Sequence, residues 1–555
     1  MSRRNALSPI SSLPPELFAD IFSILCLPST SSQGGKTDYN LARLRVSHVC
    51  HQWREIALDL PLLWSHADFT SESISSVGIA EMLIRAKSAP LDLEANISSQ
   101  RWDNNRLRTF REAVQAHVPH IRHLRISADC TLLRGTLEGL VSPAPTLEDL
   151  SLSSIRRVKR VRRMEGWLSI PNTLFNSFTP RLSRLELLNC NIRWNSPLLK
   201  GLKHLEINTV FPDARPELAV WLAALDEMPQ LTTLILHSAS PIAPSLPLVI
   251  ERTVTLSSLT HLNILGRLRD CALAIAHLDL PALTSLCLTI SSWEQPTNHN
   301  IQELLPFIVR HAHGPQDNQP LQSVLIRGDE HYIKIFAWSV PNISVVVHDI
   351  FTSLTTTPPT RVALSFACNW PRPIDRVETL EILMARLPLD NLVMFADLTN
   401  SVEAETQHFW HHLSPMWSLL QCVRLTPVSG HGFIVMLLED NGKCEKPLLP
   451  SLKQIVMVNY SLYSLSLLPL YDALRKRVDQ GVPVETLDLR MCEAHSDGRA
   501  EDWLQSLSEI VVDVLRPEQT FEVREKMESM WNSVSHSPFV DNDNPSEDYH
   551  FSSRQ

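Results

Sequence analysis

Hydrophobic residues near the start of the chain fall at helical spacing. Leu17, Ile21 and Leu25 recur every four positions, with Phe18 and Phe22 beside them. This spacing places apolar side chains on one face of a helix. Two prolines at positions 14 and 15 suit a helix start, because their missing N–H groups would be unpaired there anyway. The pattern predicts a helix up to residue 25, and the polar composition of 28–40 predicts a loop after it.

A second helix is predicted over residues 42–60, where Pro61 ends the pattern. Its apolar positions follow steps of three and four: Val46, Val49, Cys50, Trp53, Ile56, Ala57 and Leu60. Two short amphipathic helices cannot bury their apolar faces in so small a unit. We therefore expect a partner, or the rest of the chain, to cover part of this surface. On periodicity alone, an ordinary helical cap on a larger domain is an equal alternative.

Downstream, a short L-x-x-L-x-L pattern recurs twelve times, with Ile allowed for Leu. Its first apolar residues fall at positions 121, 147, 182, 202, 231, 259, 283, 321, 389, 420, 452 and 484. Internal repeats at such intervals indicate a solenoid, in which stacked units bury one continuous core. The long interval after position 321 predicts one degenerate unit near 359–366, and residues 90–93 suggest an opening strand.

Helical stripes precede several of these predicted strands. One stripe of apolar residues ends at Pro119 and another, from Leu218 to Met228, ends at Pro229. Each unit is thus predicted to be a helix, a proline break and a short strand. The expected fold class is α/β, with an N-terminal helical domain followed by an irregular solenoid.

Composition narrows the class of protein further. Leucine supplies 84 of 555 residues, and the net charge is −10, which disfavours non-specific nucleic-acid binding because that role needs surplus Lys and Arg. The ten cysteines form no CxxC pair, which fits a reducing compartment and gives no zinc motif. The first residues lack the apolar core of a signal peptide, and prolines interrupt the long uncharged stretches. We expect a cytoplasmic and/or nuclear protein with no membrane segment, metal or cofactor.

The N-terminal residues carry a family resemblance. The segment LPPELFADIFSIL, followed by RVSHVCHQWREIALDLPLLW, resembles the F-box motif, in the variant common in large fungal F-box families. The loop between the helices is longer than in a minimal F-box. The resemblance implies a helix-in-groove contact with the Skp adaptor of an SCF ubiquitin ligase and its cullin scaffold. The residues that it carries over are Leu13, Pro14, Leu17, Ile21, Val46, Cys50, Trp53, Ile56 and Trp64.

The remainder loosely resembles leucine-rich repeats, because the usual Asn or Cys after the last leucine is clear only at Cys190 and Cys492. The expected domains are a tail over 1–9, an F-box domain over 10–66, a leucine-rich-repeat-like domain over 67–534 and an acidic disordered tail over 535–555. Strand alternation suggests outward positions that contact a target protein. These are Glu186, Glu206, Asn208, His237, Asn263, Arg327, Asp488 and Arg490.

The resulting hypothesis is a non-enzymatic substrate-recognition subunit of an SCF-type ligase. The alternative is a non-degradative interaction scaffold in which the F-box-like helices cap the solenoid. No enzyme motif emerges: GGKT at 34–37 lacks the earlier glycine of a phosphate-binding loop, and His408, His411 and His412 lack further zinc ligands. The basic run 156–163 fits a solvated loop, a nuclear-import signal or a surface for a phosphorylated or acidic partner.

Overall fold

The chain divides into two compact units, Met1–Leu283 and Thr284–Gln555. The computed structural model describes residues 10, 13–25, 39–70, 75–97, 102, 104–155, 168–210, 214–243, 252–290, 298–313, 320–328, 332–340, 364–369, 373–399, 409–439, 447–462, 464–494 and 499–516. The GGKT segment, the basic run 156–163, His408 and the acidic tail all lie outside these residues. Within the described ranges, no helix has the length and apolar character needed to cross a membrane.

The first unit opens with three helices and a short 3-10 turn. These are α2 (Pro15–Leu25), α3 (Tyr39–Ser47), α4 (His51–Leu58) and η2 (Pro61–Trp64). The prediction of one continuous helix over 42–60 is wrong, because Cys50 adopts an extended conformation with φ −156° and ψ 172°. Its sulfur accepts a hydrogen bond from the Trp53 backbone N–H at 3.5 Å and so caps a new helix.

An aromatic cluster holds these helices together. The fully buried rings of Phe18 and Phe22 pack against Trp53, with centroids 5.6 and 5.1 Å away. Trp64 is also fully buried, and its indole N–H donates to the Ala57 carbonyl at 2.7 Å. The largest apolar side chains of the small domain therefore pack in its own core.

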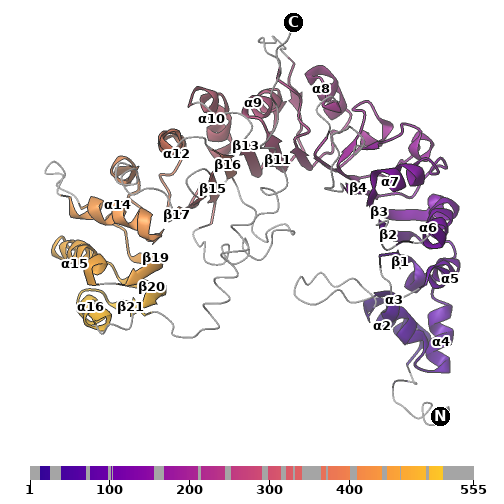
Figure 1. Ribbon diagram of the computed structural model, residues 1–555, viewed down its shortest axis with the longest axis horizontal. Helices are drawn as coiled ribbons and strands as arrows, with labels where there is room; N and C mark the ends of the chain where they lie inside the picture. The colour runs from indigo at the N-terminus through magenta and orange to yellow at the C-terminus, as the bar shows by residue number, and fades with distance from the viewer. Residues whose placement is uncertain are drawn as a thin grey trace, which may run out of the picture. The chain divides into compact units, whose positions relative to one another are not determined.

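Eight strands of the first unit form a parallel sheet in chain order. Helices lie along one side of these strands, as α5 (Ser76–Ala86), α6 (Asn104–His117), α7 (Cys130–Leu137) and α8 (Leu218–Asp226) show in Figure 1. The strands are β1 (His66–Asp68), β2 (Leu91–Ile97), β3 (Ile121–Asp129), β4 (Asp149–Ile155), β6 (Arg184–Leu188), β8 (His204–Asn208), β9 (Thr233–His237) and β11 (His261–Gly266).

The buried leucines of these strands point toward the helices, as the repeated pattern predicted. In β4, Leu150 and Leu152 are buried and pair in register with the buried Leu185 and Leu187 of β6. Two short parallel pairs, β5 (Leu168–Ser169) with β7 (Cys190–Asn191) and β10 (Val254–Thr255) with β12 (Leu278–Asp279), form separate two-stranded sheets. Helix α9 (Leu268–Ala276) follows β11.

A recurring left-handed residue ends successive strands of the first unit. Asn189, Thr209 and Ser238 have φ of 54°, 60° and 52°, one position after β6, β8 and β9. Each donates its backbone N–H to a carbonyl at the end of the next strand. The repeats therefore turn in the same way, which keeps their strands in register.

The second unit breaks the chain order of the strands. Its sheet runs β13 (Ser285–Ile290), β16 (Leu364–Asn369), β15 (Tyr332–Trp338), β14 (Ser323–Gly328) and then β17 (Met394–Thr399). Among these five described strands, only β15 is antiparallel to its neighbours. Strand β16 is the predicted degenerate unit, and it lies next to β13 instead of β14, which is where the predicted irregularity of the solenoid occurs. The hairpin of β14 and β15 places β14 two strands away from β16.

The rest of the second unit returns to regular stacking. Strands β18 (Cys422–Leu425), β19 (Gln454–Leu462), β20 (Thr486–Ala494) and β21 (Asp513–Leu515) continue in parallel from β17. The intervening helices are α10 (Asn298–His313), α12 (Pro373–Arg386), α14 (Pro427–Leu438), α15 (Ser464–Asp479) and α16 (Arg499–Ser508). All twelve strands predicted from the repeated motif are thus confirmed.

Candidate functional site

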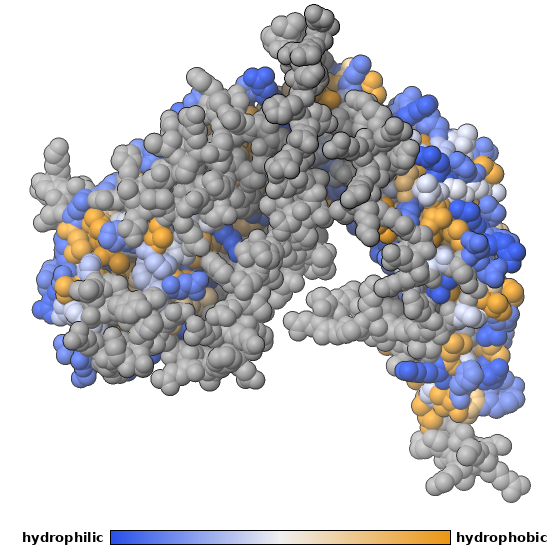
Figure 2. Space-filling model, in the orientation of Figure 1, coloured by the Kyte–Doolittle hydropathy of each residue, from blue (hydrophilic) through white to orange (hydrophobic). Residues whose placement is uncertain are grey.

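The first candidate is an apolar surface on the N-terminal helices. Figure 2 shows hydrophobic residues gathered on this part of the molecule, beside the grey N-terminal segment. Four large side chains stay exposed there although the core beneath is complete: Leu17 (47%), Ile24 (67%), Val49 (57%) and Leu62 (62%). We call these four residues the apolar patch. They come from α2, the turn before α4, and η2, so the fold itself brings them to the surface.

The structure separates the predicted adaptor-contacting residues into two groups. Pro14 and Leu17 are exposed, and Leu13, Ile21, Cys50, Trp53 and Ile56 are half-buried. Val46 and Trp64 are buried within the unit, at 7% and 0% exposure, which contradicts a direct contact role for these two. Trp64 packs under the Arg85 guanidinium, 5.0 Å from the ring, and so joins the helical domain to α5.

Three members of the apolar patch are absent from the predicted adaptor-contacting residues. Ile24 lies seven residues after Leu17 and therefore on the same face of α2, Val49 lies in the turn before α4, and Leu62 lies in the short turn after Pro61. Helical spacing could have identified Ile24, because it continues the face of Leu17 and Ile21, whereas Val49 and Leu62 lie outside the regular helices. Periodicity does not show which apolar residues stay exposed, since Phe18 and Phe22 of the same helix are fully buried.

The second candidate is the polar side of the parallel sheet in the first unit, opposite the helices. The side chains there form rows because the strands are parallel and in register. The first row runs through His66, Asp92, His123, Asp149, Arg184, His204, Thr233 and His261. The second runs through Asp68, Glu94, Arg125, Ser151, Glu186, Glu206, Ile235 and Asn263. We call these two rows the strand face.

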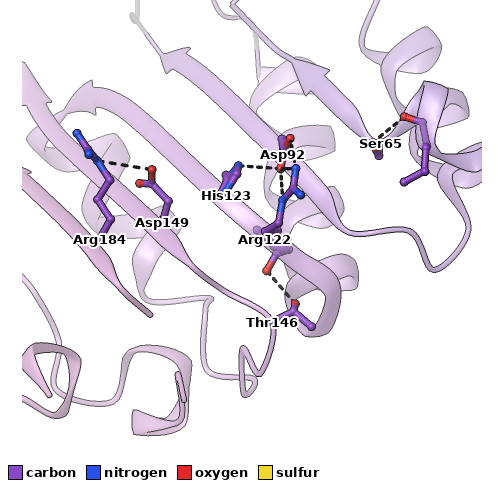
Figure 3. Close-up of polar contacts among 9 residues, drawn as sticks. Ser65, Asp92, Arg122, His123, Thr146, Asp149 and Arg184 are labelled. Carbon is purple, nitrogen blue, oxygen red and sulfur yellow. Dashed lines mark hydrogen bonds and ion pairs between the residues drawn. The ribbon is translucent and has the colours of Figure 1, made fainter. Parts of the chain in front are cut away.

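At one end of the strand face, Asp92 collects two donors. Its carboxylate lies 3.0 Å from both the Arg122 guanidinium and Nδ1 of His123, and Figure 3 shows the three side chains converging. Burial disfavours the charge on Asp92, but these hydrogen bonds outweigh it and hold the pKa of Asp92 below its ordinary value. This end of the face is therefore ionised and internally paired at neutral pH.

Further along the face, carboxylates are in excess. Arg184 bonds Glu186 through two guanidinium nitrogens and lies 3.7 Å from Asp149. Burial and then the Glu186 carboxylate raise the pKa of Asp149, and Arg184 and Arg125 offset this only in part. On β8, His204 is the largest cause that lowers the pKa of Glu206, against the opposing effect of burial.

One group on the strand face has the residue types of a metal site. Glu186, His204 and Glu206 each offer one ligand atom, and these atoms lie within 4.8 Å of one another. The histidines predicted as a weak zinc candidate do not form such a group among the described residues. His411 pairs with Glu439, and His412 is exposed.

The predicted target-contacting residues are divided between the two units. Glu186, Glu206, Asn208, His237 and Asn263 lie half-buried on neighbouring strands of the first unit, and burial lowers the pKa of His237. Arg327, Asp488 and Arg490 belong to the second unit. Asp488 lies on the same side of β20 as the exposed Arg490, as alternation predicted, but it is only 6% exposed because the Arg490 guanidinium binds its carboxylate at 2.7 Å.

Comparison with known proteins agrees with this architecture. Residues 10–70 match the family model of F-box-like domains. The chain therefore combines an F-box-like domain with leucine-rich repeats, as its sequence led us to expect. It is similar to the human F-box/LRR-repeat protein 12, at 23% identity over 306 residues, which cover 47% of this chain and 89% of the relative.

Proposed function

We propose that this protein is the substrate-recognition subunit of an SCF-type ubiquitin ligase. The F-box-like helices bind the Skp adaptor, which links them to the cullin scaffold, and the leucine-rich repeats bind a target protein. The chain does no chemistry of its own. It acts in the cytoplasm, the nucleus or both, by raising the effective concentration of a target lysine near the conjugating enzyme.

The apolar patch is the observation that carries this proposal. Fully burying a side chain of this kind stabilises a complex by about 1.5–3 kcal/mol relative to leaving it exposed. Each of the four side chains has about half to two thirds of its area available. Covering one of them is therefore worth about 1–2 kcal/mol. A helix-binding groove lined with apolar side chains is the kind of surface that matches this patch.

Ile24 offers a sharp test, because the chain contains a matched control. Ile24 on α2 and Ile84 on α5 are both 67% exposed, but only Ile24 belongs to the F-box-like domain. We expect Ile24→Asp to weaken binding of the full chain to the purified Skp adaptor by at least about 30-fold, because lost burial adds to the cost of covering a carboxylate. Ile84→Asp should bind as the wild type does.

Calorimetric titration of the full-length variants measures both affinities. Equal binding by Ile24→Asp and Ile84→Asp would overturn the proposed role of the apolar patch and leave the scaffold interpretation. Substituting Trp53 is a poorer test, because its ring packs on Phe18 and Phe22 and its loss would damage the domain core. Proximity labelling in cells treated with a proteasome inhibitor then identifies candidate target proteins.

A further inference from the structure

We infer that Glu186, His204 and Glu206 form a binding site for a divalent transition-metal cation of the zinc type. Glu186 and Glu206 lie directly opposite each other on β6 and β8, where neighbouring strands are about 4.8 Å apart. His204 lies two residues before Glu206 on the same side of β8. Two carboxylates and one imidazole are ligands that zinc and related cations accept.

The geometry needs only side-chain movement to close around an ion. The candidate ligand atoms lie within 4.8 Å of one another, and Nε2 of His204 is 3.6 Å from the Glu206 carboxylate. Ligand atoms around tetrahedral zinc are about 3.4 Å apart, given bond lengths of about 2.0–2.1 Å. Rotation about the glutamate side-chain bonds covers the remaining distance without a change in the backbone.

Two buried polar atoms at this place are poorly satisfied. Nε2 of His204 makes no hydrogen bond among the described residues and has only the Glu206 carboxylate at 3.6 Å, and Oδ1 of Asn208 is buried with no hydrogen-bond partner among them. Leaving a buried acceptor unpaired costs about 1–3 kcal/mol. A cation would satisfy the His204 nitrogen, and a water on that cation would satisfy the Asn208 oxygen. The Asn208 amide already donates to Glu206 at 2.7 Å and so orients this ligand.

Local charge also favours a cation. Like charges directly opposite on neighbouring strands destabilise a sheet, and Asp149 adds a third carboxylate beside Glu186. Arg184 and Arg125 are the guanidiniums near this group. Arg184 must release Glu186 when the ion binds, and it can then approach Asp149, which is 3.7 Å away. Metal binding therefore replaces the Arg184–Glu186 ion pair with an Arg184–Asp149 ion pair, so the Arg184 guanidinium keeps a carboxylate partner.

Three protein ligands leave at least one coordination position for another donor. The strand face is the open side of the sheet, so a histidine, cysteine or carboxylate of a bound protein can fill that position. This consequence rests on the proposed target-binding function. Metal binding itself does not, since it involves neither the apolar patch nor an adaptor.

The test uses the untagged full-length chain, stripped of metal, and Zn²⁺ or Co²⁺ alone at neutral pH. We expect one equivalent to bind, seen by calorimetry and by Co²⁺ absorption. His204→Gln and Glu206→Gln should weaken binding by more than about 100-fold, because losing a group that only orients a ligand already costs about 10–100-fold. Asn208→Ala, as such an orienting group, should weaken it by about 10-fold.

His123→Gln is the matched control, because His123 occupies the same row as His204 and also lies beside a carboxylate, yet belongs to no three-ligand group among the residues that the structure describes. It should bind metal as the wild type does. A second measurement needs no variant: Zn²⁺ should protect His204, but not His123, from modification by diethyl pyrocarbonate. No saturable binding by the wild type, undiminished binding by His204→Gln, or equal reactivity of His204 with and without Zn²⁺ would overturn the inference. None of these results bears on adaptor binding, which the Ile24 and Ile84 variants test separately.

Discussion

Arg215 and Asp270 form a buried ion pair in the first unit, which links the segment before β9 to helix α9. The guanidinium lies 2.7 Å from the Asp270 carboxylate, and the two side chains are 10% and 3% exposed. Arg215 also donates to the carbonyls of Ser240 and Pro241, and the other oxygen of Asp270 accepts from the Ala243 backbone N–H at 2.7 Å. The pair thus ties the loop after β9 to the first turn of α9.

Substituting Arg215 or Asp270 should lower the free energy of unfolding, by a different amount for each residue. Arg215→Met leaves a carboxylate with one remaining donor in the interior, and breaking a buried pair in this way costs about 3–5 kcal/mol. Asp270→Asn keeps an acceptor for Ala243 and leaves Arg215 with its two carbonyls, so the loss is one charge-assisted hydrogen bond, about 1.5–3 kcal/mol. The double variant should cost at least about 1 kcal/mol less than the two single changes added together.

Hydrogen exchange followed by mass spectrometry suits this prediction, because two units need not unfold in one step. In Arg215→Met, peptides from β9 and α9 should exchange about 100- to 5,000-fold faster, which corresponds to the predicted free energy. Peptides from β20 in the second unit serve as the internal control. Acceleration of less than about 10-fold, or strictly additive costs in the double variant, would refute the view that the pair acts as one buried unit.

Three further predictions concern stability. Trp64→Ala should cost about 3–5 kcal/mol of unfolding free energy in thermal denaturation, whereas a Trp64 that serves only a partner would cost little. Asp92→Asn should destabilise the first unit at pH 7 by about 1–2 kcal/mol. Because the pKa of Asp92 is lowered in the folded state, this difference should disappear as the pH falls below the ordinary aspartate value, in acid-unfolding curves of variant and wild type. Gly430→Ala should destabilise α14 in urea unfolding, although alanine favours helices by about 1 kcal/mol, because its Cβ would lie 1.5 Å from the buried Tyr460 hydroxyl. Adding Tyr460→Phe should restore part of the loss, and a neutral Gly430→Ala would contradict the packing shown.

The repeated strands were predictable because one physical rule governs them all. In the first unit, L-x-x-L-x-L segments such as β8 and β9 alternate buried and half-buried positions, and the segment itself contains this information. Strands β14 and β17 of the second unit keep the motif but are buried on both faces for most of their length. The neighbours of a strand are a different matter. Strand β16 pairs with β13, about eighty residues earlier, because the β14–β15 hairpin lies on its other side. The motif predicts that a strand exists, whereas its place in the sheet depends on contacts that the motif does not contain.

The exposed residues of the F-box-like domain were only partly predictable for a related reason. Val46 and Trp53 are apolar and helically spaced, and Trp64 follows in the PLLW segment after Pro61, so all three were predicted to contact the adaptor. Burial of Trp64 depends on α5, whose Arg85 covers its ring, and no local pattern reports that contact. Cys50 is similar, because its role as a helix cap appears only once the chain turns at that residue.

The metal site illustrates what a register adds to a sequence. When the repeats are aligned by their leucines, Glu186 and Glu206 occupy the same column, and His204 stands two columns before, in the column of Arg184. Residues in one column of an alignment need not lie close together, but parallel in-register pairing places these side chains in a row, on strands about 4.8 Å apart. Two glutamates in consecutive repeats then become facing carboxylates, and their negative charges must be balanced by a guanidinium, a proton or a metal ion. Arg184 forms an ion pair with one of them, Glu186. The Glu206 carboxylate lies 3.6 Å from Nε2 of His204, which makes no hydrogen bond among the described residues. This arrangement depends on the pairing of β6 with β8, so we expected no metal from the sequence but infer one from the fold.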